Sequence, residues 1–230
     1  MMTLESLSAE QPGFADAYDV LARAQLDQGM FEAALATYKS AAALTPTNIS
    51  RLQCLGQMTF YMGNHADAER LLERTARLGL DSKMFDCQSL VLLAMSRLDS
   101  EDRRGLQRCQ DDFTRLQQRS PDNRRLQRLA EFTHLVLKLY RKDIDALLQG
   151  GAALAGQIES PEFDYEIAGN LLALLAQMQL RSMPFPDADK LVEKIGMRFC
   201  SNRAITELLA RSAAVHPPFA EQVRNAQTTI

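Results

Sequence analysis

Residues at matching positions recur 34 places apart in the N-terminal part of this chain. The matched pairs are Leu21 and Leu55, Ala22 and Gly56, Gly29 and Gly63, Ala34 and Ala68, Tyr38 and Leu72, and Pro12 and Pro46. A helix–turn–helix unit of about this length cannot bury its own apolar face, so such units stack on copies of themselves. The period therefore predicts stacked pairs of helices, an architecture whose long surface usually binds other proteins.

Local signals at the ends of the predicted helices agree with this period. Gly29 and Gly63 are expected to end the first helix of each pair, because glycine adopts left-handed backbone at little cost. Pro46 and Pro121 are expected to end second helices, since proline lacks the amide proton that a continuing helix needs. Side-chain caps for the helices that follow are offered by Thr47, Asn48, Asp81 and Ser82.

Two consecutive segments, residues 15–48 and 49–82, resemble the tetratricopeptide repeat, and residues 83–123 resemble a degenerate third copy. That copy is 41 residues long, seven more than the period, and we expect the additional residues around positions 99–104. The residues that carry the resemblance are Tyr18, Leu21, Ala22, Gly29, Ala34, Tyr38, Ala41 and Pro46, then Leu52, Leu55, Gly56, Gly63, Ala68, Leu72 and Thr75, and finally Cys109, Phe113, Leu116 and Pro121. The resemblance implies an all-α fold, a right-handed helix–turn–helix repeat solenoid (a TPR-like superhelix) with additional C-terminal capping helices.

Residues 1–14 are predicted to form a partial or capping helix that packs Leu4 and Leu7 inward. Pro12 lies 34 residues before Pro46, so it too would end a second helix. The chain would then begin halfway through a repeat. Two interpretations stay open, a short capping helix or a fragment of a larger protein. We favour the second, since some bacterial signalling proteins join a receiver domain to such repeats.

Residues 124–230 are expected to continue the solenoid as a C-terminal helical extension. Apolar residues at helical spacing predict helices over residues 124–141, 144–157, 162–180, 187–199, 201–215 and 217–226. The glycines at positions 150, 151 and 156 permit a close neighbour, and the two prolines of residues 183–186 predict a rigid elbow. No segment shows convincing strand alternation, so the whole chain is predicted to hold about eleven or twelve helices.

Composition excludes several classes of protein. No stretch of 18 or more apolar residues is present, and the first residues lack the basic and apolar pattern of a secretory signal, so no membrane insertion is expected. Four cysteines are widely spaced and none forms a C-x-x-C pair. Reduced, buried thiols in a cytoplasmic protein are the simplest interpretation.

No enzyme signature is recognisable in the sequence. His65, His134 and His216 lie some 70 to 80 residues apart and none belongs to a metal-binding pattern such as H-E-x-x-H. No cysteine has an activating neighbourhood in sequence. We therefore predict no catalytic residues, no metal ligands and no cofactor.

The resemblance implies that the first helix of each repeat lines a concave groove. The groove residues carried over from it are Asp19, Arg23, Asp27, Gln53, Gln57, Phe60, Tyr61, Met84 and Val91. A subset of the family holds a terminal carboxylate with Lys, Asn and Arg, but here Asp19 and Gln53 replace the first two, which argues against such a clamp. An amphipathic helix or an extended segment suits the graded surface better. The alternative is that Phe60, Met84 and Val91 are covered by the chain itself, as apolar residues at helical spacing usually are.

A basic segment gives a second candidate surface. Residues 101–142 carry eleven Lys or Arg and six Asp or Glu, a net charge of +5 in a chain of net charge −3. The candidate residues on this basic face are Arg104, Arg108, Arg124, Arg125 and Arg128. Interleaved aromatic residues are missing and the pI is about 5.7, which argue against nucleic acid. A solvated face, an acidic protein partner or self-association with the acidic remainder of the chain are the options left open.

The sequence thus predicts a non-catalytic scaffold for protein–protein interaction, which binds a peptide or helix of another protein in the groove. It would serve as the repeat module of a bacterial signalling or assembly protein. The alternative is a regulatory or nucleic-acid-binding module that uses the Arg-rich face of residues 103–128.

Overall fold

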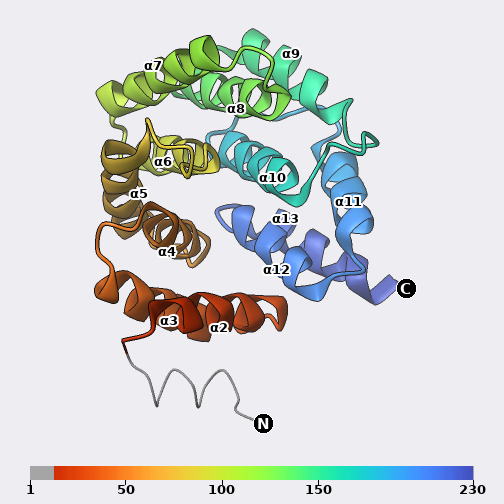
Figure 1. The fold of residues 1–230 in the computed structure, drawn as a ribbon. Coiled ribbons are helices and arrows are strands. Elements are labelled where there is room, and N and C mark those ends of the chain that lie inside the picture. Colours follow the sequence, from red (N-terminus) through yellow and green to blue (C-terminus); the bar gives the residue numbers. More distant parts are fainter. Residues whose placement is uncertain (1–12, 230) are drawn as a thin grey trace. The chain divides into compact units, whose positions relative to one another are not determined.

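The computed structural model describes residues 13–229, and these residues form twelve α-helices, one short 3-10 helix and no strand (Figure 1). The predicted all-α class is therefore confirmed for this part of the chain. The helix expected over residues 1–14 lies outside the described residues except for its last two positions.

The chain divides into two compact units, one ending at Ser96 and the other beginning at Arg97. The boundary falls within helix α6 (Gln88–Asp99). It therefore lies inside the predicted third repeat, residues 83–123, and not at its C-terminal end. Each unit is described separately below.

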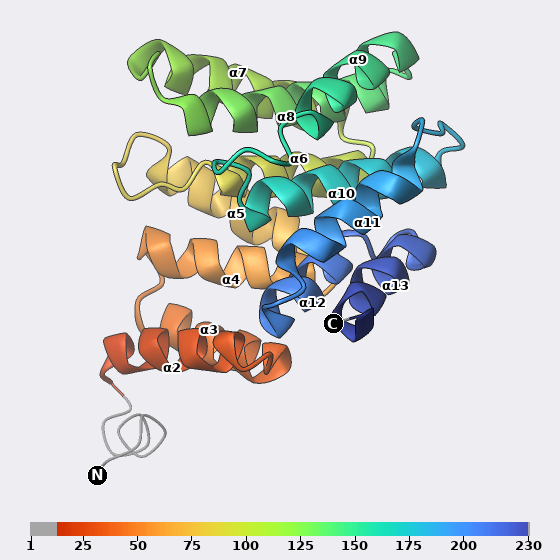
Figure 2. The same cartoon turned by 90° about the vertical axis from the view of Figure 1, so that its right-hand side faces the viewer.

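The N-terminal unit contains two helix pairs followed by most of α6. The first pair is α2 (Ala15–Asp27) and α3 (Phe31–Leu44), and the second is α4 (Ile49–Tyr61) and α5 (His65–Gly79). The two helices of each pair lie side by side, and α3 also contacts α4 (Figure 2).

Small residues lie where the paired helices cross, as the repeat pattern predicted. Ala22, Ala34 and Ala68 are fully buried. A Cβ atom added to Gly56 would lie only 2.8 Å from the Leu72 side chain, so a larger residue would force α4 away from α5. Close contact between the helices is therefore the reason for the residue type at these positions.

Five helices of the chain end in the same turn. The second residue beyond each of these helices adopts left-handed backbone, at Gly29 (φ 73°), Gly63 (φ 78°), Glu101 (φ 55°), Lys142 (φ 58°) and Ser182 (φ 56°). The N–H of the following residue then donates to a carbonyl five positions earlier, as in the bond from Met30 to Gln25 (2.8 Å) and the bond from Asp143 to Lys138 (3.1 Å). This is the Schellman arrangement, which satisfies carbonyl groups that a helix end leaves free.

A second connection also recurs, between the end of one pair and the start of the next. Pro46 and Pro121 each lie two residues beyond a helix end, as predicted. The N–H of Asn48 donates to the Thr45 carbonyl oxygen (3.0 Å), and the N–H of Asn123 donates likewise to Ser120 (3.2 Å). Both asparagine side chains then cap the next helix, which confirms the cap expected at Asn48.

Two expected helix starts were wrong. Helix α6 begins at Gln88, not near residue 83, and Ser82 accepts the N–H of Met84 within the preceding loop instead of capping a helix. The residues additional to the period therefore lie before α6 and in the long helix α7 (Arg103–Arg119), since only residues 100–102 connect the two helices. Helix α10 (Tyr165–Leu180) begins three residues later than expected, because Asp164 is its cap.

The C-terminal unit is built around α8 and α10. Helix α8 (Arg124–Tyr140) lies against α7, α9 (Ile144–Ala155) and α10. Helix α10 in turn packs against α11 (Ala188–Phe199) and α12 (Arg203–Ser212), and α13 (Pro217–Asn225) closes the unit against α11 and α12, followed by the 3-10 helix Ala226–Thr229. Almost every residue of α10 up to Met178 is buried.

Glycines and prolines in this unit act as the sequence indicated. A Cβ atom on Gly150 would lie 2.5 Å from Leu135, and one on Gly151 would lie 2.7 Å from Phe185. Residues 181–187 connect α10 to α11 without helical structure, which confirms the predicted elbow. The close approach of α9 to α8 therefore depends on Gly150, and the close approach of α9 to Phe185 in the elbow depends on Gly151.

The shared turn yields a stability prediction. We expect Lys142→Gly to raise the free energy of unfolding by about 1 kcal/mol, because a Cβ atom disfavours left-handed backbone. The reverse change, Gly63→Ala, should lower it by a similar amount, since a Cβ there would contact no neighbour and only the backbone would be strained. Urea unfolding followed by circular dichroism measures both.

Lys39→Gly is the matched control, because Lys39 is exposed within α3 and has ordinary helical backbone. It should lower the free energy of unfolding by about 1 kcal/mol. Equal destabilisation by Lys142→Gly and Lys39→Gly would contradict the role given to the left-handed turn.

Candidate protein-interaction surfaces

A pocket in the N-terminal unit lies between helices α2, α3 and α4. We call it the α2–α4 pocket; its volume is about 360 Å³, and it is lined by Asp19, Val20, Arg23, Tyr38, Ser50, Arg51 and Cys54. Two of its residues, Asp19 and Arg23, were predicted to line a binding groove. The others were not foreseen.

Arg51 is the centre of the pocket's charge arrangement. Its guanidinium donates to Asp19 through Nε (2.9 Å) and Nη2 (2.8 Å), to Asp16 through Nη2 (2.5 Å), and to Thr45 through Nη1 (2.8 Å). The Arg51 side chain is only 8% exposed, whereas Asp16 is 75% exposed. Hydrogen bonds to Asp19 raise the pKa of Arg51, so the cation is permanent. This network ties α2 to the start of α4.

The remaining pocket residues differ in polarity and exposure. Burial raises the pKa of both Tyr38 and Cys54, so these two groups are neutral at pH 7. Val20 is 54% exposed and Arg23 is exposed. The pocket thus combines the neutral side chains of Tyr38 and Cys54 with the Asp19 carboxylate, which Arg51 already holds. The apolar Val20 and the cationic Arg23 are open to solvent.

Gln53 and Gln57, which were predicted to line a binding groove, hold the loop before α6. Gln57 Nε2 donates to the Asp86 carboxylate (3.2 Å). With its amide oriented to satisfy both polar atoms, Gln53 donates to the Met84 carbonyl oxygen (3.0 Å) and accepts from the N–H of Asp86. Gln53 is only 3% exposed. Both side chains therefore stabilise this loop, although they lie at positions that were predicted to bind a ligand.

The other predicted groove residues are scattered. Met84 lies in the loop before α6 and is 66% exposed, not on a helix as predicted. Phe60 and Val91 are buried, and the Phe60 ring stacks on His65 with 4.7 Å between centroids. Tyr61 meets the edge of Phe60, and Asp27 is exposed at the end of α2. Of the predicted groove residues, Asp19 and Arg23 line the α2–α4 pocket.

Most of the predicted basic face is paired with carboxylates of its own unit. Arg124 and Arg128 both pair with Glu162, the first at 3.5 Å, and Arg125 pairs with Glu166. Arg108 lies 4.0 Å from Asp102, and Arg104 is exposed on α7. Glu162 precedes α10 and Glu166 lies in its first turn, both about forty residues after the arginines they pair with. Spacing in the sequence therefore did not suggest these pairs.

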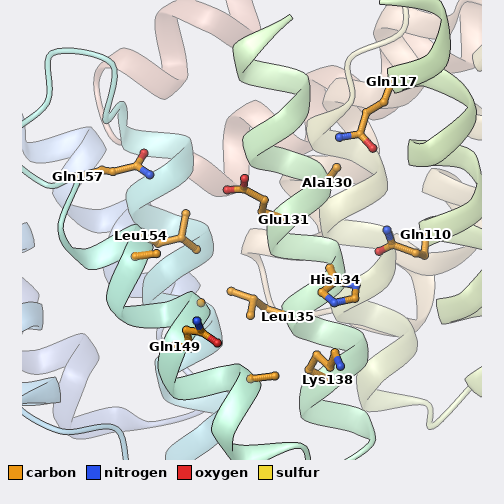
Figure 3. Close-up of a pocket in the computed structure, with 13 residues that line it drawn as sticks. Gln110, Gln117, Ala130, Glu131, His134, Leu135, Lys138, Gln149, Leu154 and Gln157 are labelled. Atoms are coloured by element: carbon orange, nitrogen blue, oxygen red, sulfur yellow. The ribbon is translucent and has the colours of Figure 1, made fainter. Parts of the chain in front are cut away.

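A larger groove in the C-terminal unit was missed by sequence reasoning. It lies between α7, α8 and α9 and has a volume of about 550 Å³ (Figure 3). Four glutamines line it, Gln110 and Gln117 from α7, Gln149 from α9, and Gln157 from the turn that follows α9. Single glutamines at such positions are usually solvated, so their pattern gave no functional signal.

Within residues 13–229, no group of three or more His, Cys, Asp or Glu side chains could hold a metal ion. In the same residues, no helix combines the length and apolar character needed to cross a membrane. Searches with protein-family models and against curated proteins gave no match. The tetratricopeptide resemblance therefore stays a prediction from the repeat residues.

The structure predicts that Gln53 controls the loop before α6. Gln53→Leu keeps the side-chain volume but removes the bond to the N–H of Asp86, so we expect that amide to exchange with solvent about tenfold faster. Hydrogen–deuterium exchange followed by NMR measures this rate.

Gln25→Leu is the matched control, since Gln25 accepts a hydrogen bond from Thr37 in the same unit but away from the loop. It should leave exchange at Asp86 unchanged. If Gln53→Leu also leaves that exchange unchanged, the loop is held by other contacts.

Proposed function

We propose that this chain is a non-catalytic protein-interaction module that binds a segment of another protein through the α2–α4 pocket. One observation carries the proposal. Asp19 and Arg23, at positions that the tetratricopeptide resemblance assigns to ligand binding, do line a pocket. The repeated helix pairs and the small residues at their crossings support the same class of protein.

The chemistry of the pocket favours a protein segment over a small anion. Arg51 already has carboxylate and hydroxyl acceptors, so it has little left to offer a free anion. Arg23 and Val20 lie one turn apart on the exposed side of α2, and one is cationic while the other is apolar. A ligand with an acidic and an apolar side chain at neighbouring positions complements both, as an amphipathic helix or an extended segment can.

The basic face is the weaker candidate for binding. Arg124, Arg125 and Arg128 have carboxylate partners within their own unit, which lowers the positive potential available to nucleic acid. A regulatory or nucleic-acid role for residues 103–128 is therefore our second choice.

The cellular setting belongs to the same proposal. Four free cysteines suit a reducing compartment, so we place the protein in the cytoplasm. We also propose that it serves as the repeat module of a signalling or assembly protein of bacteria, because the resemblance points to scaffolds of that kind.

The pocket can be tested with a charge-reversal variant. A partner is first captured from a lysate of the source cells, identified by mass spectrometry and purified. We expect Val20→Asp/Arg23→Glu to weaken its binding at least tenfold in calorimetry, because both side chains are exposed contact residues. Circular dichroism should show an unchanged fold.

Two further variants separate the alternatives. Lys39→Glu reverses an exposed charge on α3 that does not line the pocket, and it should leave the affinity unchanged. Arg104→Glu/Arg108→Glu reverses two charges of the basic face. A partner that is lost only with this last variant, and whose binding weakens strongly with salt, would contradict the proposal and favour the second choice.

A further inference from the structure

The groove between α7, α8 and α9 has polar side chains along both sides. Figure 3 shows Gln110 and Gln117 from α7 on one side, and Gln149 from α9 and Gln157 from the turn after α9 on the other. On α8, between them, lie Glu131, His134 and Lys138. An amide side chain offers both a donor and an acceptor, which are the two groups that each peptide unit of a backbone also presents.

The lower part of the groove is apolar and small. Ala130, Leu135 and Leu154 are buried, and Gly150 faces the Leu135 side chain. Because no side chain projects from Gly150, the Leu135 side chain packs directly against the α9 backbone there and forms part of the apolar lining. Such a surface accepts small or branched apolar side chains.

The charges of the groove nearly cancel. Lys138 pairs with Asp143 at 2.8 Å, which neutralises the one lysine in the lining. Partial burial, followed by the nearby cations Lys138 and Arg141, lowers the pKa of His134, so its imidazole is neutral at pH 7. Only Glu131 adds an uncompensated charge within the lining. A neutral, hydrogen-bonding ligand therefore fits better than a phosphate or a polyanion.

One acceptor in the lining is not used by the protein. Gln110 Oε1 is buried, and it has no hydrogen-bond partner among the described residues. A buried acceptor without a donor is costly, so a ligand that brings an N–H group to it would gain stability. Peptide N–H groups are donors of this kind.

The dimensions agree with a short extended peptide. Gln110 and Gln117 are seven residues apart on α7, about 10 Å along the helix. An extended chain rises about 3.3 Å per residue, so the distance between these two amides corresponds to about three residues. Alternate side chains of such a peptide would point to the apolar floor and to solvent.

We propose that the α7–α8–α9 groove is a second binding site, which holds an extended peptide by hydrogen bonds from the glutamines to its backbone. Recognition then depends on backbone conformation and on small or branched apolar side chains at alternate positions, and less on charge. The site is independent of the α2–α4 pocket, because no residue is shared between them.

The probe is the peptide acetyl-Thr-Val-Thr-Val-Thr-amide, which alternates polar and apolar side chains and carries no charge. Titrated into the full chain labelled with ¹⁵N, it should cause saturable shifts of the side-chain amide signals of Gln110, Gln117, Gln149 and Gln157. A second peptide with the same side chains, but with its two valine nitrogens methylated, lacks those backbone donors and should bind at least fivefold more weakly.

Variants of the chain test the same contacts from the protein side. Gln110→Leu/Gln149→Leu removes one amide from each side of the groove at similar side-chain volume. It should weaken binding of the first, unmethylated peptide at least fivefold. Gln118→Leu is the matched control, since Gln118 is exposed on α7 next to Gln117 but does not line the groove. It should bind as the unchanged chain does.

Three results would overturn the proposal. They are the absence of saturable shifts at the four glutamines, equal binding of the methylated peptide, and equal binding by a folded Gln110→Leu/Gln149→Leu variant. None of them bears on the α2–α4 pocket, so failure here leaves the proposed function open to its own test.

Discussion

The left-handed residue after the first helix of a pair is the constraint on which the rest of the structure depends. Its backbone reverses the chain within three residues, so the second helix starts at a fixed point relative to the first. The paired helices can then lie close only where small residues such as Ala22 and Gly56 meet a neighbour. This close packing sets α2 beside α3 and α4, where Arg51 can reach Asp19 and form the α2–α4 pocket.

The sequence predicted the fold best where glycine or proline carried the signal. Gly29, Gly63 and Pro46 ended their helices as expected, whereas the same turn at Lys142 carried no signal. The turn is made by backbone hydrogen bonds, and glycine only lowers the free-energy cost of its left-handed residue. A lysine can therefore occupy the same position, and the sequence then gives no sign of the turn. The start of α6 was missed for another reason. The Asp86 carboxylate accepts the N–H of Gln88 (3.0 Å) at the start of α6, and Asp86 is held there by the distant Gln53 and Gln57, which local signals do not show.

Prediction of the candidate sites was less complete, because residues at equivalent positions of the repeats have different structural roles. Arg23 lines a pocket, the equivalent Gln57 holds a loop, and the equivalent Val91 is buried in the core. The resemblance assigned all of them to one groove, since it describes positions and not what the neighbouring segments do there. Arg51 was overlooked because its carboxylate partners, Asp16 and Asp19, lie more than thirty residues earlier in the chain. Periodicity thus locates a surface, while long-range contacts decide which residues remain on it.

Site-directed photo-crosslinking tests the central claim most directly, namely that the exposed face of α2 contacts the partner. A photoreactive residue is placed at Val20, and separately at Met197 on α11, since both positions are similarly exposed, at 54% and 46%. After irradiation in the source cells, the account predicts a covalent adduct with one partner protein from position 20 and none with that protein from position 197. An adduct with the partner from position 197 alone would contradict it.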